Sequence, residues 1–216
     1  SRIAKKYNIP WVADFRDTWS NNPAYPFSNF RRALDKYLEK RIISQSDLIT
    51  TVSEAYGENL KKIHKGKIKV IPNGYTCLSP PANPIVNSSV LNIVYTGTIY
   101  EGFQNFPIFL KAVKKALENG LIDEEYLRID FYGRYIFGLQ EIIEDLDLST
   151  CVFQNGFVSR EEAFDAQRRA DLLLFFNWEG LEAGLSHLKL YEYLGSMKPI
   201  FVVGSKVDAS NQKIVE

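Results

Sequence analysis

Apolar residues follow two patterns along this chain: short continuous runs, and longer stretches where they recur at helical spacing. Short runs are typical of buried strands, and helical spacing is typical of helices that face a core. In the first part of the chain the patterns predict a helix end over Ser1–Tyr7, strands over Pro10–Ala13, Leu48–Val52 and Ile68–Ile71, and helices over Phe30–Ile43 and Glu54–Ile63. In the helix over Phe30–Ile43, the apolar residues Phe30, Leu34, Tyr37, Leu38 and Ile42 lie roughly on one face.

A second alternation begins at Leu91. It predicts strands over Leu91–Thr96, Leu127–Tyr132, Val152–Phe153, Leu172–Phe176 and Ile200–Val203, and helices over Asn105–Leu117, Ile136–Leu146, Arg160–Arg169 and from near His187 to Lys198. Strand, helix and strand repeated at this spacing indicate a parallel sheet. The strand ends at Gly97, Gly133, Gly156 and Asn177 should then meet at one edge, where doubly wound sheets bind ligands. The expected fold class is α/β, with two Rossmann-like doubly wound parallel-sheet domains.

The predicted elements divide the chain into two domains. Three strands with their helices are too few to cover both faces of the first sheet, so we expect residues 1–80 to be the second half of an incomplete domain. Three prolines and little periodicity over residues 76–89 indicate a linker, which we place at 81–90. Residues 91–216 form the second domain, whose last helices we expect to be truncated after Val203.

Composition excludes several classes of protein. The 26 Lys and Arg balance 26 Asp and Glu, so bulk charge does not indicate a nucleic-acid binder. Cys77 and Cys151 lie far apart without metal-ligand spacing and are expected to be free thiols, which favours a reducing cytoplasm. With His64 and His187 as the two histidines, a histidine-rich metal site is not expected. No Walker loop or strand-linked G-x-G-x-x-G is present, which disfavours kinases and nicotinamide-dependent dehydrogenases.

The stretch Gly184–Val203 carries the candidate site, because a loop, a helix and a strand follow one another there. Ser186 is a plausible N-cap, and Pro199 stops the helix at Lys198. We expect one helical stripe to face a core and the strand to be covered on both sides. The stripe consists of Leu190, Tyr193, Leu194 and Met197, and the strand of Ile200–Val203.

The amino end of this helix is suited to an anion. Backbone N–H groups near His187 and Leu188 are unpaired there, and the helix dipole adds partial positive charge. Lys189 adds a cation, and Glu192 on the same face can accept two hydrogen bonds from a diol such as a ribose. The alternative, which the sequence pattern alone favours, is an ordinary amphipathic helix in which Lys189 and Glu192 form a solvated pair.

A resemblance to a known family favours the anion-binding interpretation over the ordinary amphipathic helix. KLYEYL followed by a small residue and KPI resembles the nucleotide-sugar site of retaining glycosyltransferases of the GT-B type, family four. ITTVSEAYGENL, KIKVIPNGY and IVYTGT resemble that family's passage between its two domains, so the likeness runs from about Pro10 to Val203. It implies an acceptor domain over 1–80, a donor domain over 91–216, Lys189 near the donor diphosphate and Glu192 on the ribose. Phe157 and Val158 would contact the base through backbone groups, although a plain surface loop fits them equally well.

The chain departs from the family pattern in two places. The family commonly has an Arg and a Lys shortly after the glycine of Gly97-Thr98, but no cation follows here, so Lys189 or Arg134 would carry more of the charge. Gly97-Thr98 alone is also compatible with a plain tight turn. The family has a Glu seven residues before the ribose-binding Glu, where this chain has Gly184. Either Glu179 or Glu182 replaces that carboxylate, or none does.

Other charged motifs are less informative. Asp14, Arg16 and Asp17 follow a predicted strand and are either caps or site residues. Arg16 stands where many relatives have His, so no general base is expected there, and catalytic residues stay unassigned. Asp145-x-Asp147 matches the metal-binding DxD of another architecture, but it ends a helix with no strand before it, which favours a solvated surface.

The resemblance implies a metal-independent hexosyltransferase that needs no cofactor and moves a sugar from a nucleotide-diphosphate donor to a hydroxyl with retention. Polysaccharide or glycolipid biosynthesis, a saccharide or lipid-linked acceptor, and a cytoplasmic location with peripheral contact at the inner face of a membrane are further expectations. Two alternatives stay open, a nucleotide-sugar epimerase or hydrolase of the same architecture and a non-catalytic nucleotide-binding module. The incomplete first domain predicts little activity for this chain by itself.

Overall fold

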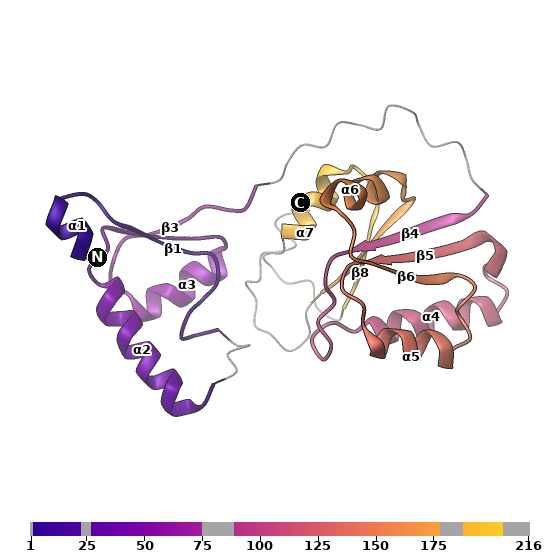
Figure 1. Ribbon diagram of the computed structural model, residues 1–216, viewed down its shortest axis with the longest axis horizontal. Helices are drawn as coiled ribbons and strands as arrows, with labels where there is room; N and C mark the ends of the chain where they lie inside the picture. Colours follow the sequence, from indigo (N-terminus) through magenta and orange to yellow (C-terminus); the bar gives the residue numbers. More distant parts are fainter. Residues whose placement is uncertain (1, 23–26, 75–88, 178–187, 205–216) are drawn as a thin grey trace. The chain divides into compact units, whose positions relative to one another are not determined.

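The computed structural model describes residues 2–22, 27–74, 89–177 and 188–204. These residues form two compact units, one within residues 2–74 and one within 89–177 and 188–204. Each unit is built on its own parallel sheet, of three and five strands respectively (Figure 1). None of the helices within the described ranges is both long enough and apolar enough to cross a bilayer.

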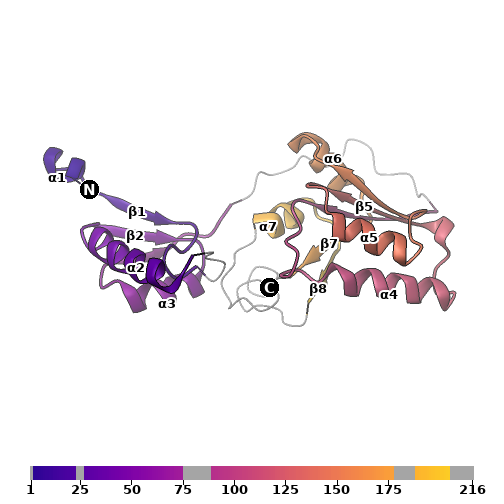
Figure 2. The same cartoon turned by 60° about the horizontal axis from the view of Figure 1, so that its bottom comes forward.

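The first unit is a three-stranded parallel sheet in the order β1-β2-β3. Its elements are α1 (Arg2–Tyr7), β1 (Val12–Phe15), α2 (Asn29–Ile43), β2 (Leu48–Thr51), α3 (Glu54–Ile63) and β3 (Ile68–Val70). Ser28 and Ser53 start α2 and α3 as N-caps, because each hydroxyl accepts a hydrogen bond from a backbone N–H three residues later. Both helices lie on the same face of the sheet, as right-handed crossovers between neighbouring parallel strands require (Figures 1 and 2).

Helix α2 buries a different face from the one its apolar residues indicate. Asp35 and Glu39 are 2% and 1% exposed, whereas Phe30, Leu34, Tyr37 and Ile42 are exposed. The two carboxylates tolerate burial because both are hydrogen-bonded. Glu39 accepts from the backbone N–H of Ser20 at 2.8 Å and lies 3.0 Å from His64 Nε2. Asp35 pairs with Arg31 at 3.0 Å.

The second unit is a five-stranded parallel sheet in the order β6-β5-β4-β7-β8. Its elements are β4 (Leu91–Thr96), α4 (Phe106–Glu118), β5 (Leu127–Tyr132), α5 (Phe137–Asp145), β6 (Val152–Gly156), α6 (Arg160–Arg169), β7 (Leu172–Phe176), α7 (Leu188–Gly195) and β8 (Ile200–Val203), with a 3-10 turn over Glu124–Tyr126. Helices α4 and α5 cover one face and α6 and α7 the other (Figures 1 and 2). The strand order reverses between β4 and β7, so a topological switch point lies there, as predicted for a doubly wound sheet.

The core of the second unit contains a cluster of aromatic rings among aliphatic side chains. The rings of Tyr95, Phe131, Phe109 and Phe176 pack with centroid distances of 5.4 to 6.4 Å between β4, β5, β7 and α4. Cys151 is buried at the edge of this core and forms no disulfide. Burial raises the pKa of its thiol to about 11, so this cysteine is an inert packing residue. Cys77 lies outside the described residues.

Two predicted details of this unit are wrong. Helix α7 ends at Gly195 rather than Lys198, because Met197 adopts a left-handed backbone with φ of 54°, and its side chain is 75% exposed instead of core-facing. Strand β8 is the outer strand of the described sheet, so Phe201 and Val202 are 49% and 43% exposed rather than covered on both sides. Strand β6 reaches Gly156, the strand end that the sequence predicts.

Candidate functional site

Three glycines lie side by side at the carboxyl edge of the second sheet. The N–H of Gly97 donates to the carbonyl of Tyr132 at 2.7 Å, and the N–H of Gly133 donates to the carbonyl of Gly156 at 2.8 Å. A Cβ at Gly133 would overlap the carbonyl oxygen of Gly97, and all three glycines have positive φ. The strand ends can therefore approach one another, and they present backbone rather than side chains at the edge where parallel sheets bind ligands.

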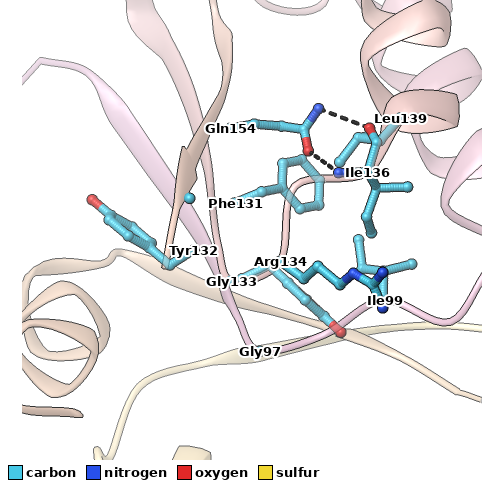
Figure 3. A pocket seen from close by; sticks show the side chains of 11 residues that line it. Gly97, Ile99, Phe131, Tyr132, Gly133, Arg134, Ile136, Leu139 and Gln154 are labelled. Carbon is cyan, nitrogen blue, oxygen red and sulfur yellow. Dashed lines mark hydrogen bonds between the residues drawn. The ribbon is translucent and has the colours of Figure 1, made fainter. Parts of the chain in front are cut away.

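A small hollow opens beside these glycines, lined by Gly97, Ile99, Gly133, Arg134 and Gln154 among others (Figure 3). Its floor is held by Gln154, whose side chain bonds both the N–H and the carbonyl of Ile136 at 3.0 and 3.1 Å. The free volume is about 10 Å³, enough for roughly one water molecule. A larger ligand would thus lie over the glycines rather than inside this hollow.

Lys189 reaches Gly97 from α7. Its Nζ donates to the Tyr95 hydroxyl at 2.5 Å and lies 3.7 Å from the centre of the Tyr95 ring. A Cβ on Gly97 would come within 2.9 Å of Lys189 Cε, so the lysine stem occupies the space that the glycine leaves. The cation predicted from the sequence is therefore fixed at the end of β4, beside the switch point.

The surroundings of Lys189 weaken its positive charge. Burial lowers the pKa of Lys189 to about 7, and the charge of Glu192 opposes this shift without cancelling it. Burial also keeps Tyr95 neutral, because it raises the pKa of the phenol well above its usual value. Among the described residues, Lys189 forms no ion pair. This cation is half-buried, lacks a counter-ion there, and would be stabilised by an anionic ligand.

This environment gives a prediction on pH. An anion beside Lys189 should restore its pKa toward the usual 10.5, so binding takes up a proton at a pH between the free and bound values. Affinity for a nucleoside diphosphate should therefore fall as pH rises above about 7. Calorimetry in two buffers of different ionisation enthalpy at about pH 8.5 should show proton uptake approaching one per ligand. Affinity that is flat with pH and an absence of proton uptake would contradict the assignment.

Glu192 has a different partner from the one expected. Its Oε1 lies 3.4 Å from Arg160 NH2, and the Glu192 side chain is 21% exposed. Arg160 begins α6, directly after the N-cap Ser159, and is largely exposed. Lys189 and Glu192 thus do not form the solvated pair of the alternative interpretation. The sequence analysis missed Arg160, and its position just after Phe157 and Val158 was the available signal.

Helix α7 is anchored by a buried hydrogen-bond chain. The backbone N–H of Thr96 donates to the Tyr193 hydroxyl at 2.9 Å, and Gln167 Nε2 donates to the Thr96 hydroxyl at 2.9 Å. Burial raises the pKa of Tyr193 to about 12, so the phenol stays neutral. Because Tyr193 lies between Lys189 and Gly195 on α7, this chain fixes both Lys189 and Glu192 relative to β4.

The loop after β4 is fixed to the end of β7. Gln104 accepts from the backbone N–H of Tyr100 and donates to the carbonyl of Phe176, both at 2.9 Å. The Tyr95 hydroxyl donates to the carbonyl of Thr98 at 2.9 Å, so the same phenol that receives Lys189 also holds the turn. The two sides of the switch point are therefore connected through side chains that the sequence pattern did not single out.

The remaining candidates lie around this centre or outside the described residues. Thr98 is half-buried, Arg134 is exposed on the rim of the hollow, and Phe157 and Leu188 are 78% and 47% exposed. Val158 is half-buried beside Phe157. His187, Gly184, Ser186, Glu179 and Glu182 lie outside the described residues, so their predicted roles stay predictions.

In the first unit, the charged residues in the last part of β1 and directly after it are exposed. Asp14 accepts a hydrogen bond from the Thr50 hydroxyl at 2.6 Å, and Arg16 donates to the side-chain carbonyl of Asn73. Asp17 is exposed as well. Asp145 and Asp147, in the second unit, are exposed at the end of α5, as the surface interpretation predicts. No group of three or more His, Cys, Asp or Glu that could hold a metal occurs within the described ranges.

Comparisons with known proteins fit this geometry. Residues 1–77 match the family model described as Glycosyltransferase Family 4. HepE from Anabaena, solved with UDP, superimposes with a TM-score of 0.65 at 16% identity over 98% of this chain and 63% of its own. The pneumococcal O-GlcNAc transferase GtfA superimposes with a TM-score of 0.64 at 16% identity, over 100% of this chain and 41% of its own. Sucrose-phosphate synthase from Thermosynechococcus elongatus superimposes with a TM-score of 0.63 at 13% identity, over 93% of this chain and 52% of its own.

These neighbours define the class of the fold, which is the GT-B architecture of glycosyltransferases with two Rossmann-like domains. More particularly, residues 1–77 are similar to Glycosyltransferase Family 4. The chain spans between 38% and 63% of the first four similar structures. No curated protein matches its sequence.

Proposed function

We propose that this chain is part of a retaining glycosyltransferase that moves a hexose from a nucleotide-diphosphate sugar to a hydroxyl. The observation that carries the proposal is Lys189, a half-buried cation held over Gly97 at the reversal of strand order. Ligands of doubly wound sheets bind at this point, and a desolvated cation there favours an anionic ligand. The similarity of residues 1–77 to Glycosyltransferase Family 4 supports the reaction class.

In this proposal the chain's residues bind the donor by its nucleotide part. Lys189 and the amino end of α7 stabilise the diphosphate, whose charge increases as the sugar leaves. Glu192 accepts hydrogen bonds from the ribose hydroxyls, and Arg160 holds its carboxylate in place. Arg134 on the rim adds a second cation beside the exposed backbone of Gly97 and Gly133. We further propose that the reaction needs neither a metal ion nor a cofactor, since positive charge from the protein neutralises the leaving group.

The ligands bound in similar structures support a choice of donor and acceptor to test first. HepE is solved with UDP and glucose, and TarM with UDP, fondaparinux and a GlcNAc-glycerol compound. We therefore propose a uridine diphosphate sugar as donor and a saccharide or lipid-linked acceptor, with a role in polysaccharide or glycolipid synthesis. A cytoplasmic location with peripheral contact at the inner face of a membrane is part of the same proposal.

The experiment that tests the function has two stages. Calorimetric titration with UDP, ADP and GDP should show binding of at least one diphosphate, and a failure of all three to bind would reject the proposal. Incubation of the protein with the matching nucleotide sugar and either water or an alcohol acceptor then identifies the reaction. Transfer of the sugar to the alcohol with retained configuration would support the proposed glycosyltransferase. Free sugar or an epimer would indicate a hydrolase or epimerase, and binding without any product would indicate a non-catalytic nucleotide-binding module.

Removal of the Glu192 carboxylate should weaken nucleotide binding. Glu192→Ala deletes the acceptor for the ribose hydroxyls, and charge-assisted hydrogen bonds of this kind support a loss of about tenfold or more in affinity. Calorimetry with UDP measures the loss, with Glu118→Ala at the exposed end of α4 as a matched control. Equal affinity in the variant and the unaltered chain would remove Glu192 from the site.

A further inference from the structure

Tyr95 places a buried hydroxyl at the carboxyl end of β4. The residue is 1% exposed, and its ring packs on Phe131 and Phe176 at centroid distances of 5.8 and 5.4 Å. A phenylalanine would make the same ring contacts, so packing alone does not account for the hydroxyl. Burial of a hydroxyl costs free energy unless the group is hydrogen-bonded. The role of the hydroxyl therefore lies in the bonds that its oxygen makes.

Both bonds of this oxygen have a defined direction. The hydroxyl donates its only proton to the carbonyl of Thr98 at 2.9 Å, so toward Lys189 the oxygen can only accept. An acceptor 2.5 Å from Nζ favours the ammonium over the neutral amine, because the charged donor makes the stronger bond. The ring acts in the same direction, since Nζ lies 3.7 Å from its centroid. Tyr95 thus favours the charged form of a lysine whose pKa burial lowers to about 7.

The same contacts fix the position of the ammonium. The stem of Lys189 passes over Gly97, where an added Cβ would come within 2.9 Å of Cε. An ammonium has three N–H donors, and Tyr95 accepts from one of them. Within the part of the chain that the structure describes, no protein acceptor is recorded for the other two. These donors can therefore bind an anion at the end of β4.

We propose that Tyr95 is a positioning residue of the donor site, whose hydroxyl keeps Lys189 protonated and leaves its remaining N–H donors to the diphosphate. The inference rests on the proposed function and adds to it a residue that does not touch the donor. The other titratable groups that act on this pair are, among the described residues, Glu192, Tyr193 and Tyr100. Deletion of the Tyr95 hydroxyl leaves all three in place.

Tyr95→Phe tests the proposal, because it keeps the ring and deletes the hydroxyl. Without this acceptor, the pH at which Lys189 loses its proton should fall by about one unit, the order of one hydrogen bond to a charged group. The loss of affinity for UDP should then grow with pH, from about twofold near pH 5.5 to about tenfold near pH 8.5. Calorimetric titration over this range measures the loss. A purely structural role of the hydroxyl would cost the same at every pH.

Two further measurements show whether Tyr95 acts through Lys189. In the Lys189→Ala background, Tyr95→Phe should change the affinity for UDP by less than about twofold, since the group that it positions is gone. The other measurement is urea unfolding without ligand. Stability should rise with pH from near pH 7 in the unaltered chain, because folded Lys189 loses its proton there, and from about one unit lower in Tyr95→Phe.

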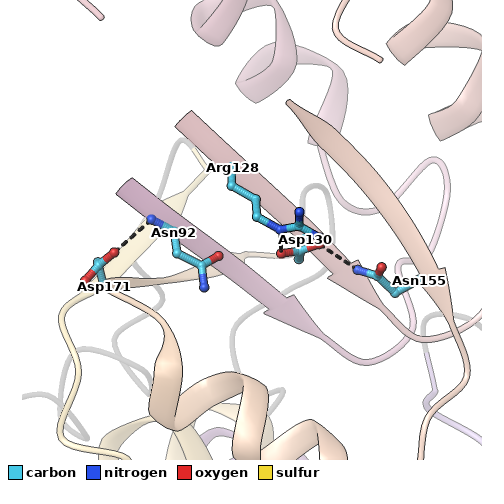
Figure 4. A network of polar contacts seen from close by, with 5 residues as sticks. All are labelled: Asn92, Arg128, Asp130, Asn155 and Asp171. Carbon is cyan, nitrogen blue, oxygen red and sulfur yellow. Dashed lines mark hydrogen bonds and ion pairs between the residues drawn. The ribbon is translucent and has the colours of Figure 1, made fainter. Parts of the chain in front are cut away.

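Asp171→Ala is the matched control for the loss of a hydrogen bond on β4. The carboxylate of Asp171 accepts from the backbone N–H of Asn92 at 2.8 Å, at the amino end of the strand and away from Lys189 (Figure 4). This variant should bind UDP like the unaltered chain at every pH, even where it is less stable. A pH-dependent loss of affinity in Asp171→Ala would show that weakening β4 anywhere has the same effect, and would overturn the proposal.

Three results with Tyr95→Phe would also overturn it. They are an unchanged affinity for UDP, a loss that is equal at low and high pH, and a loss that persists in full in the Lys189→Ala background. Failure of the unaltered chain to bind any of the diphosphates would instead reject the proposed function. The urea measurement would then still decide whether the Tyr95 hydroxyl keeps Lys189 protonated, so the two failures are distinguishable.

Discussion

Lys189→Ala is expected to weaken UDP binding about 100-fold, a loss of about 3 kcal/mol. The magnitude follows from the position of the cation, which is half-buried over Gly97 and bonded to the phenol of Tyr95 at 2.5 Å. A charge-assisted bond in such a site is worth more than one in water, and its removal leaves the diphosphate without its nearest cation. Calorimetric titration with UDP at about pH 7 measures the effect.

The matched control for this prediction is Lys198→Ala, which removes a lysine two residues before β8 and should bind UDP like the unaltered chain. The variant at Lys189 should also fold well. The pKa of Lys189 in the unaltered chain is about 7 when folded, against its usual 10.5, so the folded state binds fewer protons between these pH values and its stability rises with pH there. Lys189→Ala should abolish that rise. A variant that binds UDP normally would remove Lys189 from the site, and a variant that unfolds would show that Lys189 has a structural role instead.

Gly133→Ala is expected to destabilise the second unit by about 3 kcal/mol or more. Gly133 has φ of 146°, a conformation that only glycine adopts readily, and its added Cβ would overlap the carbonyl oxygen of Gly97. Neither strand end can move away freely, because the Gly97 N–H is bonded to Tyr132 and the Gly133 N–H to Gly156. Unfolding in guanidinium chloride, followed by tyrosine and tryptophan fluorescence, should show a lower midpoint.

Gly120→Ala provides the comparison. Gly120 follows α4 with φ of 64°, but a Cβ there would meet nothing within 4 Å. Only the backbone preference is then lost, at about 1 kcal/mol. If the two variants lost equal stability, close approach of the strand ends would not be the cause of the loss in Gly133→Ala. The tight packing of the glycines at the site would then contribute nothing to the stability of the second unit.

The sequence predicted the order and type of the elements well, because short apolar runs and helical spacing are local signals. The strands Leu91–Thr96, Leu127–Tyr132 and Leu172–Phe176 have the predicted bounds. The end of α7 was not predictable in the same way. Pro199 forbids a helix beyond Lys198, but the left-handed backbone of Met197 ends it earlier, and no local pattern signals that.

Helix α2 shows where apolar periodicity fails. The pattern groups Phe30, Leu34 and Tyr37 on one side, and a soluble helix normally buries that side. The structure buries Asp35 and Glu39 instead, because Ser20 and His64 supply hydrogen bonds to Glu39 from distant parts of the chain. Such partners lie 19 and 25 residues away and leave no trace in helical spacing.

The candidate site was predictable in its main cation and carboxylate but not in their partners. The likeness to a known family pointed to Lys189 and Glu192, and the structure places both on α7. Tyr95 and Arg160, which contact them, lie 94 and 32 residues away and come from different strands and helices. A sheet brings such residues together only through its strand order, and that order is not written in any one segment.

The bond pattern of Gln104 has a consequence for the thermodynamics of ligand binding. Since its amide joins the loop after β4 to the last residue of β7, the two borders of the switch point are already immobilised in the unliganded chain. A ligand that enters there has few torsions left to freeze, so the conformational entropy lost on association is small. Gln104 would then influence affinity through rigidity, without touching the ligand.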